Sequence, residues 1–381
     1  MPLLAPPKSL TLLEIAHELQ AEAVGDVNFS ITAVAHPVFA QHHETLALAM
    51  DKGSYALLKS THAGAAIVSK GMEVDLDQFA GGVVITERYR VALAWLTQAF
   101  SPRLHFVSGI HPSAVVDPSA KIGDGASVGP LCVIGSEARI GANAVLLSQV
   151  TIATGAEVGT GSLLHPGARV GDNCLIGNDC ILHHNVSIGA DGFGFVTSDE
   201  GSIERAQKTG KITAFNHDIR RINSLGNVII GDSVEIGAGS CVDRGTLGPT
   251  RIGNGTKIDN LVQIGHNVTI GENVLIAGGV GIAGSARVGD RVVIGGNAGI
   301  GDHKSIGDDA IVAGMSGVIT DLEPGTVYAG YPARPIKETQ RLEINKLRTG
   351  KALRDLSSLV QRVDKLEKQA EKRREQSGDV E

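Results

Sequence analysis

Ile110-His-Pro-Ser-Ala-Val-Val116 opens a run in which every sixth residue, as far as Ile188, is a branched aliphatic. The same spacing resumes at Ile230 and, after a short slip, runs without a break from Ile252 to Val318. Neither the 3.6-residue period of a helix nor the alternation of a strand gives a repeat of six. Such a repeat is typical of a parallel β-helix, in which three six-residue segments make one triangular coil and the aliphatic side chains stack inside.

Each face of such a coil is a strand of only a few residues, which cannot bury its apolar side alone. Stacking successive coils about 4.8 Å apart closes a continuous column of Ile and Val. Gly, Asn and Asp often follow the inward aliphatic, as in Ile122-Gly123 and Ile140-Gly141. These residues suit tight corners, where a positive φ is often needed. The repeat therefore predicts both a fold that is mainly β and the residues that fill it.

The composition agrees with a solenoid filled by aliphatic side chains. Aromatic residues make up 3% of the 381 residues, and Gly numbers 49. The net charge of −7, from 34 Lys and Arg against 41 Asp and Glu, excludes a general basic field for nucleic acid. The four cysteines form no CxxC pair, so we expect small buried residues in a reducing cytoplasm. Residues 1–13 contain no long apolar stretch, and we predict no secretory signal and no integral membrane segment.

The pattern changes along the chain and predicts three parts. Residues 1–108 are expected to form a small α/β domain, residues 109–333 the β-helix with an excursion at 189–229, and residues 334–381 a helical extension. In that extension the a/d spacing of apolar residues suits packing around an oligomer axis, and the residues concerned are Leu353, Leu356, Val360 and Val363.

Local signals place the elements of the first part. Thr11-Leu-Leu-Glu14 reads as a capping box that opens a short helix, which Gly25-Asp26 is expected to end. Ala65–Ser69 is predicted to be a buried strand, and Arg88–Phe100 a second helix that holds Trp95.

His266 stands out among the histidines because of its neighbours. It follows the inward Ile264 by two places, which puts it at a corner of the coil. Gly284 lies one coil along, so its N–H is predicted to lie close to the imidazole, and His303 lies about two coils away on a similar edge. A histidine base beside an exposed backbone donor suits acyl transfer, because the base takes a proton from the attacking group while the N–H holds the oxyanion.

Metal binding is the competing interpretation, since trimeric β-helices with zinc-dependent carbonic anhydrase activity exist. That activity needs three histidines that converge across an interface, and Asp308 stands where a further one would be wanted. The pairs His42-His43 and His183-His184 are adjacent in sequence, so in strands their side chains would point to opposite faces and chelate poorly. We therefore predict no metal site.

Four segments together resemble the UDP-3-O-acylglucosamine N-acyltransferases of lipid A biosynthesis. They are Gly189-Ala-Asp-Gly-Phe-Gly-Phe195, Val242-Asp-Arg-Gly-Thr246, Ile258-Asp-Asn-Leu-Val-Gln-Ile-Gly-His-Asn-Val268 and Ala277-Gly-Gly-Val-Gly-Ile-Ala-Gly284. Hexapeptides are shared by many transferases, whereas the Asp-Gly-Phe-Gly-Phe and Asp-Asn-x-x-Gln-Ile-x-His-Asn motifs are far more specific. The order of the three parts agrees with this family as well, and the resemblance implies that the β-helix is left-handed.

The resemblance also implies an activity. The family transfers a 3-hydroxyacyl chain from acyl carrier protein to the 2-amino group of a UDP-linked 3-O-acylglucosamine, without a further cofactor. Carried over by motif, His266 is the general base, the Gly284 amide is the oxyanion donor and His303 is a second active-site histidine. No positioned nucleophile is visible in the sequence, which favours direct attack on the thioester. The family works as a homotrimer with its sites between subunits.

The expected substrate contacts form three groups. The active-site motif contributes Asp259, Asn260, Gln263 and Asn267, and the excursion contributes Asp191, Phe193 and Phe195. The third group falls at Leu46–Tyr55, which lacks the Phe, Asn and Pro of the family's uracil-holding segment, and there the candidates are Asp51, Lys52 and Tyr55.

The basic stretch Arg334–Arg354 has a natural partner in the acidic acyl carrier protein. Its proposed contacts are Arg334, Lys337 and Arg341, and the alternative is a solvated helix face. Two other functions also stay open at this stage. One is acyl or acetyl transfer to another nucleotide sugar, and the other is a non-catalytic β-helix that binds nucleotide sugars or only scaffolds. The excursion, in which Ala214–Leu225 replaces a shorter link of the family, either shapes the site or packs on a neighbouring subunit.

Overall fold

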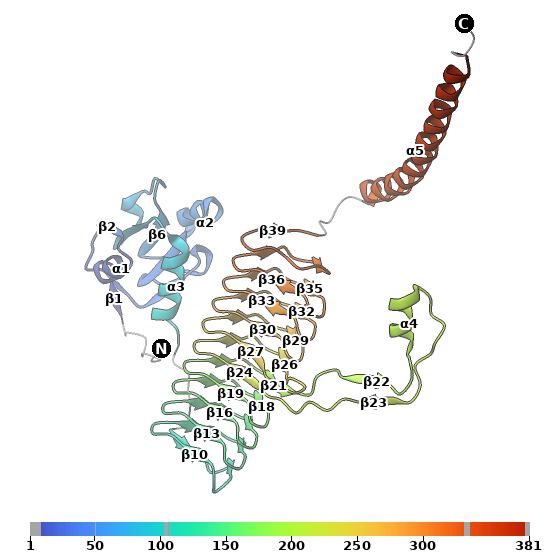
Figure 1. Ribbon diagram of the computed structural model, residues 1–381. Coiled ribbons are helices and arrows are strands. Elements are labelled where there is room, and N and C mark those ends of the chain that lie inside the picture. The colour runs from blue at the N-terminus through green and yellow to red at the C-terminus, as the bar shows by residue number, and fades with distance from the viewer. Residues whose placement is uncertain (1–8, 50, 103–105, 107, 331–335, 378–381) are drawn as a thin grey trace.

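The structure is a computed structural model that describes residues 9–49, 51–102, 106, 108–330 and 336–377. It comprises a small α/β unit, a long β-helix, an arm that leaves the β-helix and a C-terminal helix (Figure 1). In the part of the chain so described, no helix is long and apolar enough to cross a membrane.

The first helix, α1 (Leu12–Glu18), begins at Thr11 with the predicted capping box. The Thr11 hydroxyl accepts from the Glu14 N–H at 3.2 Å, and the Glu14 carboxylate accepts from the Thr11 N–H at 2.7 Å. The predicted end of the helix is wrong, because α1 stops before Gly25 and residues Glu22–Gly25 form strand β2. β2 pairs antiparallel with β7 (Gly82–Thr86), so the backbone groups of this segment are satisfied by the sheet instead of a longer helix.

A five-stranded mixed sheet organises this unit, with the strand order β2-β7-β6-β5-β4. β6 spans Ala65–Ser69 and is almost wholly buried, as predicted, and α3 (Tyr89–Ala99) confirms the second helix. Leu12, Ile15 and Leu96 pack on one face of the sheet. The remaining elements are β1 (Leu10–Thr11), β3 (Ser30–Ile31), β4 (Ala33–Ala35), η1 (Pro37–Phe39), β5 (Thr45–Ala49), α2 (Lys52–Ala56), η2 (Leu57–Ser60) and η3 (Leu76–Gln78).

The β-helix consists of three parallel sheets of very short strands, as the six-residue repeat predicts (Figure 1). We number them in chain order. Sheet I contains β8 (Gly109–Ile110), β11 (Ser127–Val128), β14 (Val145–Leu146), β17 (Leu163–Leu164), β20 (Ile181–Leu182), β25 (Glu235–Ile236), β28 (Lys257–Ile258), β31 (Leu275–Ile276), β34 (Val293–Ile294), β37 (Ile311–Val312) and β39 (Val327–Tyr328). Sheet II contains β9 (Val115–Val116), β12 (Val133–Ile134), β15 (Thr151–Ile152), β18 (Arg169–Val170), β21 (Ser187–Ala190), β26 (Cys241–Asp243), β29 (Gln263–Ile264), β32 (Gly281–Ile282), β35 (Gly299–Ile300) and β38 (Gly317–Val318). Sheet III contains β10 (Lys121–Ile122), β13 (Arg139–Ile140), β16 (Glu157–Val158), β19 (Leu175–Ile176), β24 (Val228–Ile230), β27 (Thr250–Ile252), β30 (Thr269–Ile270), β33 (Arg287–Val288) and β36 (Ser305–Ile306).

Inward aliphatic side chains stack on their equivalents in the next coil. Ile134 pairs with Ile152, and both are at most 1% exposed. Ile110 is 50% exposed because it lies in the first coil, which has no coil beneath it. All four cysteines are free, and Cys132, Cys174 and Cys180 are buried, as expected.

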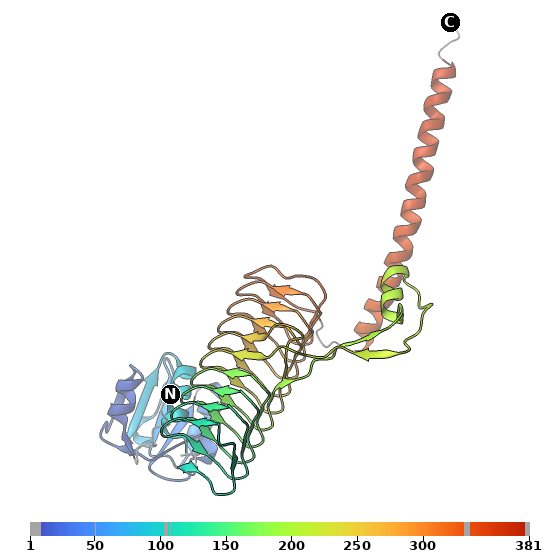
Figure 2. The same ribbon diagram turned by 60° about the horizontal axis from the view of Figure 1, so that its bottom comes forward.

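The arm, residues 191–227, leaves the β-helix after β21 and returns at β24. It carries the antiparallel pair β22 (Phe195–Thr197) and β23 (Ile219–Arg221), with α4 (Ser202–Thr209) between them. Figures 1 and 2 show it extending away from the coils. Its apolar side chains are unusually open, and those at least two-thirds exposed are Phe193, Ile203, Ile212, Phe215 and Leu225.

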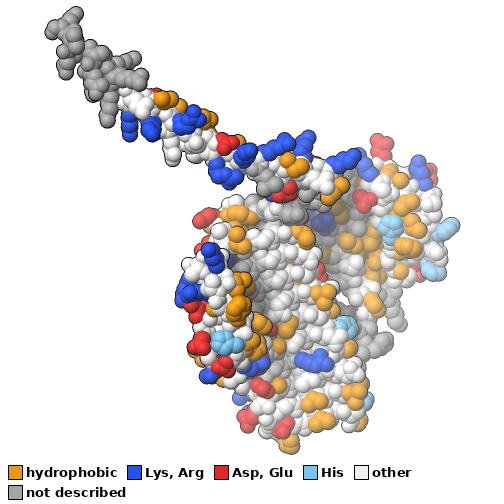
Figure 3. Space-filling model, turned by 90° about the vertical axis from the view of Figure 1, so that its right-hand side faces the viewer, with side chains coloured by type: hydrophobic (Ala, Val, Ile, Leu, Met, Phe, Trp, Pro, Cys, Tyr) orange, Lys and Arg blue, Asp and Glu red, His pale blue; other side chains and the backbone are white. Residues whose placement is uncertain are grey.

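The C-terminal helix α5 (Ile336–Ser377) confirms the predicted change from strand to helix. Six of its apolar residues form a stripe in which each side chain is 50% to 63% exposed, and they are Leu353, Leu356, Leu359, Val360, Val363 and Leu366. Figure 3 shows Lys and Arg side chains along the same helix. In a single chain, therefore, this apolar stripe has nothing to cover it.

The stacked aliphatic core predicts that two adjacent residues of one strand differ sharply in how much stability is lost when each is replaced by Ala. Ile270→Ala removes a side chain that is 2% exposed and should cost ~2–5 kcal/mol of stability, because its coil cannot collapse around the gap. The matched control Thr269→Ala, at an exposed position of β30, should change stability by less than about 0.5 kcal/mol. Thermal unfolding followed by circular dichroism measures both; equal shifts would contradict the stacked core.

Candidate active site

His266 lies at the corner that follows sheet II, two residues after the buried Ile264. The turn there is made by Asn267, which has a φ of +61°. Asn tolerates this left-handed conformation better than most residues. Thr250 fixes the turn, because its hydroxyl accepts from the Asn267 N–H at 2.8 Å. The imidazole is thus half-buried at a corner, as predicted.

The Asn267 side chain sets the tautomer of His266. Its Oδ1 accepts from the Thr246 N–H at 3.0 Å, and its Nδ2 donates to the Gly248 carbonyl at 3.3 Å, so the orientation of the amide is fixed. His266 Nδ1 lies 3.1 Å from the same Oδ1, and since that oxygen only accepts, Nδ1 carries the hydrogen. Nε2 therefore keeps its lone pair, and no described residue bonds to it.

Gly284 lies directly beside the imidazole, as the spacing of the repeat predicts. A Cβ at this position would lie 2.7 Å from His266 Cε1 and 2.8 Å from Nε2, so only glycine fits without displacing the ring. The Gly284 carbonyl accepts from the His303 N–H at 3.1 Å, and the His266 carbonyl accepts from the Ser285 N–H at 2.9 Å. These two bonds tie three successive coils together at this corner.

The N–H of Gly284 differs from that of Thr154, which has the equivalent place in an earlier coil. At the same corner, the Thr154 N–H donates to the Asp172 carboxylate of the next coil at 3.1 Å. Asp302 has the corresponding place one coil beyond Gly284, but it makes no such bond. Within the described ranges, no group accepts from the Gly284 N–H. This donor is therefore free beside the unprotonated nitrogen of His266.

An open cavity surrounds this pair. Its lining includes four side chains from the β-helix that could touch a ligand, namely Asp243, Gln263, His266 and His303. Asp191, Phe193 and Phe195 of the arm line it as well. The sequence predicted all of these except Asp243.

Three charged residues that line the cavity were not among the predicted contacts, namely Arg221, Asp302 and Asp243, and of these Asp243 is buried. It is 8% exposed, and burial raises the pKa of its carboxyl group. Gln263 hydrogen-bonds to it and acts in the opposite direction. The only sequence signal was its place in Val242-Asp-Arg-Gly-Thr246, where the pattern gives no sign that the side chain is buried.

The beginning of the arm packs onto the corner that holds His266. A Cβ at Gly192 would lie 2.8 Å from His266 Cβ, so the chain crosses the histidine at close range. Asp191 forms an ion pair with Arg221, whose guanidinium lies 5.9 Å from the centre of the Phe195 ring. The rings of Phe193 and Phe195 meet edge to face at 5.2 Å.

Comparison with known proteins identifies the family. A family model for bacterial transferase hexapeptides (six repeats) matches residues 249–284, and one for the GMPPB C-terminal domain matches residues 107–192. The UDP-3-O-acylglucosamine N-acyltransferase of Paracoccus denitrificans (strain Pd 1222) is 52% identical over 254 residues, covering 65% of this chain and 68% of that protein. This chain belongs to the UDP-3-O-acylglucosamine N-acyltransferase family. It is therefore an acyltransferase.

A second relative and a solved structure are also similar to this chain. The enzyme of the same name from Ruegeria pomeroyi (strain ATCC 700808 / DSM 15171 / DSS-3) is 48% identical over 255 residues, covering 65% of this chain and 69% of its own. Among solved structures, Arabidopsis UDP-N-acetylglucosamine acyltransferase is 28% identical, with a TM-score of 0.48, and the match covers 58% of this chain and 71% of that one.

In this acyltransferase, Asp259 and Asn260 do not lie with His266. They occupy the corner after sheet I, where they bond to backbone. The Asp259 carboxylate accepts from the Gly278 N–H at 3.0 Å, and Asn260 Oδ1 accepts from the Ala238 N–H at 2.6 Å. Within one chain they therefore hold neighbouring coils together, and a substrate contact stays a prediction.

The other predicted contacts of the acyltransferase lie on separate elements. Asp51 caps α2 by accepting from the Ser54 N–H at 2.7 Å, and Lys52 and Tyr55 lie on that helix. On α5, Lys337 and Arg341 are exposed. Arg334 lies outside the described residues.

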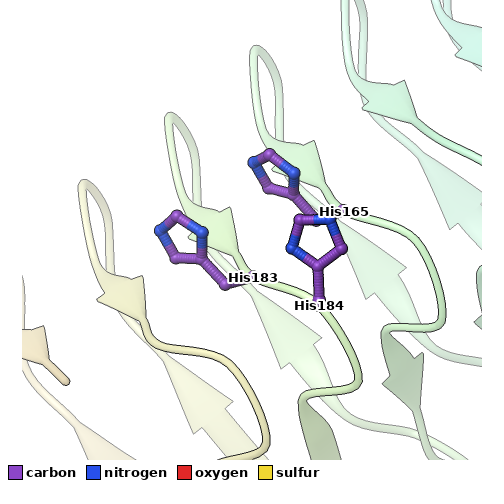
Figure 4. Close-up of side chains that lie close together, drawn as sticks. All are labelled: His165, His183 and His184. Atoms are coloured by element: carbon purple, nitrogen blue, oxygen red, sulfur yellow. The ribbon is translucent and has the colours of Figure 1, made fainter. Parts of the chain in front are cut away.

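The expectation for His183-His184 is wrong. Both residues follow β20 at a corner of the coil, not in a strand, so the alternation of strand side chains does not apply. Together with His165 they form a cluster whose nitrogen ligand atoms all lie within 4.8 Å of one another (Figure 4). The predicted geometry, with the two side chains on opposite faces, is therefore not the geometry of the structure.

The close approach at Gly284 gives a test of this corner. Gly284→Ala should lower kcat at least ~10-fold, because the new methyl group displaces the His266 ring and crowds the adjacent N–H. Gly317→Ala is the matched control, since a Cβ there meets nothing within 4 Å, and it should retain activity. Steady-state acyl-transfer kinetics compare the two, and a fully active Gly284→Ala enzyme would refute the arrangement.

Proposed function

We propose that this acyltransferase moves a 3-hydroxyacyl chain from acyl carrier protein to the 2-amino group of UDP-3-O-acylglucosamine, a step of lipid A biosynthesis. The proposal rests on one observation above all. The unprotonated Nε2 of His266 lies beside a backbone N–H, that of Gly284, which has no acceptor in the described structure. A base and an oxyanion donor at the same point are what transfer of an acyl group requires.

The chemistry is a direct displacement on the thioester. The substrate amine attacks the carbonyl carbon as His266 Nε2 takes its proton, and the carbonyl oxygen becomes an oxyanion held by the Gly284 N–H. The C–S bond then breaks, the new amide remains on the sugar, and His266 returns the proton to the departing thiolate. Asn267 keeps Nδ1 protonated throughout, and its oxygen stabilises the imidazolium while that exists.

The cavity favours direct transfer over an acyl-enzyme. No Ser, Thr or Cys is among the described residues that line it. Cys132, Cys174 and Cys180 lie in the column, whereas Cys241 is half-buried with its Sγ 3.7 Å from Asp243 Oδ1. Burial raises the pKa of all four thiols. A thiol kept neutral inside the coil is a poor nucleophile.

We assign acceptor binding to the mouth of this cavity. Phe193 is 83% exposed and next to the Phe195 ring, so the pair offers an aromatic surface for a sugar or a base. Asp243 and Gln263 supply polar contacts deeper in the same cavity. His303, exposed at the rim, is suited to contact the substrate as it approaches the base.

A homotrimer explains why so much of a single chain is uncovered. The apolar residues of the arm and of α5 are exposed far beyond what a monomer needs, and the catalytic cavity is open on one side. Asp259 and Asn260 lie at a different corner from His266, so only a neighbouring copy could bring them to its site. A symmetric ring of subunits supplies such contacts.

The first test is the reaction itself. Purified protein is mixed with UDP-3-O-acylglucosamine and a panel of 3-hydroxyacyl carrier proteins, and the product is detected by mass spectrometry. We expect an acyl mass gain on the sugar amine. Transfer from acetyl-CoA in place of the carrier protein would support the alternative nucleotide-sugar acetyltransferase, and no transfer with any donor would favour a non-catalytic scaffold.

His266→Ala tests the base. It should lower kcat by ~10²–10⁴-fold while the trimer stays folded, because the amine proton then has no acceptor. His62→Ala, which removes an exposed histidine of the N-terminal unit, is the control and should leave kcat unchanged. Near-normal turnover by His266→Ala would refute its assignment.

The carrier-protein surface has its own test. Replacing Lys337 and Arg341 with Glu should raise the KM for acyl carrier protein about tenfold and leave kcat unchanged, since an acidic partner is repelled during encounter. The same change at Lys365 and Lys368, which are exposed farther along α5, is the control. A KM that rises equally in both variants would point to a general charge effect and away from a docking site.

A further inference from the structure

The coil register stacks two histidines at the corner after sheet I. His165 follows Leu164 and His183 follows Leu182, and these two leucines pair in adjacent strands. The His165 N–H donates to the Leu182 carbonyl at 2.8 Å, which fixes the height of one coil above the other. Their rings are consequently stacked, with centroids 4.9 Å apart and planes at 13°.

A third imidazole joins them because the chain turns. His184 begins the turn in which Asn185 has a φ of +58°, so its side chain points back over the previous coil. Its ring lies 4.9 Å from that of His165. Figure 4 shows the three rings facing one another from two neighbouring coils. One ring nitrogen from each lies within 4.8 Å of the others.

Glu235 forms a hydrogen bond with one of the three histidines, His183. Its carboxylate lies 2.8 Å from His183 Nε2, so Nε2 carries the hydrogen and Nδ1 is left with a lone pair. A carboxylate behind a ligating histidine is the usual outer support of a metal site, because it fixes both tautomer and ring orientation.

The surroundings of His165 disfavour its charged form. Burial, followed by the charges of His183 and His184, lowers the pKa of His165 to about 4. His165 and His183 are half-buried and His184 is exposed, so an ion can enter from solvent.

We propose that His165, His183 and His184 bind a divalent transition-metal ion, with Zn²⁺ the best suited. Three neutral imidazoles are a common ligand set for zinc, and they leave a fourth position for water or a group from another molecule. Ligation at about 2.1 Å requires nitrogens about 3.4 Å apart, so the rings close on the ion by rotating slightly. The site belongs to a different corner from His266, and it does not depend on the acyl-transfer proposal.

Direct metal titration tests the proposal. Untagged full-length protein is stripped with a chelator and titrated with Zn²⁺ at neutral pH by calorimetry. We expect saturable binding of one ion per chain, and visible absorption bands of a four-coordinate site when Co²⁺ is used instead. His165→Gln and, separately, His184→Gln should abolish this binding, while Glu235→Gln should weaken it ~10-fold or more.

Two controls separate this cluster from other histidines. His42→Gln with His43→Gln removes another adjacent pair, and His266→Gln removes the proposed base; both proteins should bind Zn²⁺ as the unchanged chain does. Circular dichroism verifies that each variant is folded. If the unchanged chain binds no Zn²⁺, or if His165→Gln and His184→Gln bind it as tightly as that chain does, the proposal is overturned.

Discussion

Stacking of one inward aliphatic side chain on its equivalent in the next coil is the constraint on which this molecule depends. A strand of two residues, such as β15, has no stability of its own, and it exists because Ile152 is enclosed by Ile134 on one side and Val170 on the other. Every coil must therefore return to the same place at the same height. The arm does not disturb the stacking, because Ile188, which precedes the arm, pairs with Val242, which follows it.

The same stacking also brings the residues of the candidate active site together. Residues one coil apart are brought within one interstrand spacing, whatever their side chains. His266 and Gly284 meet in this way, and the absence of a Cβ on Gly284 leaves room for the ring beside an unused N–H. The stacked coils hold both residues in place, and the hydrogen bond to Asn267 decides which nitrogen of His266 carries the hydrogen.

The three corners of the prism are chemically distinct. The corner after sheet II holds His266 and receives the start of the arm, whereas the corner after sheet I holds the cluster of His165, His183 and His184. A residue's place in the six-residue repeat therefore decides which of its distant neighbours it meets. Two separate groups of polar side chains can share one repeat because they lie at different corners of the coil.

The sequence by itself determined the β-helix, the residues that fill it, the helices at both ends and the meeting of His266 with Gly284. These follow from a local and strictly periodic pattern, because the eighteen-residue coil converts spacing along the chain directly into distance. Only the tertiary structure decided the rest. Asp243 is buried, and residues 22–25 form β2 because β7 offers them a partner. His184 turns towards His165 because a corner backbone, with Asn185 at positive φ, does not alternate as a strand does. Side chains at corners and sheet edges take their surroundings from segments that no local pattern relates to them.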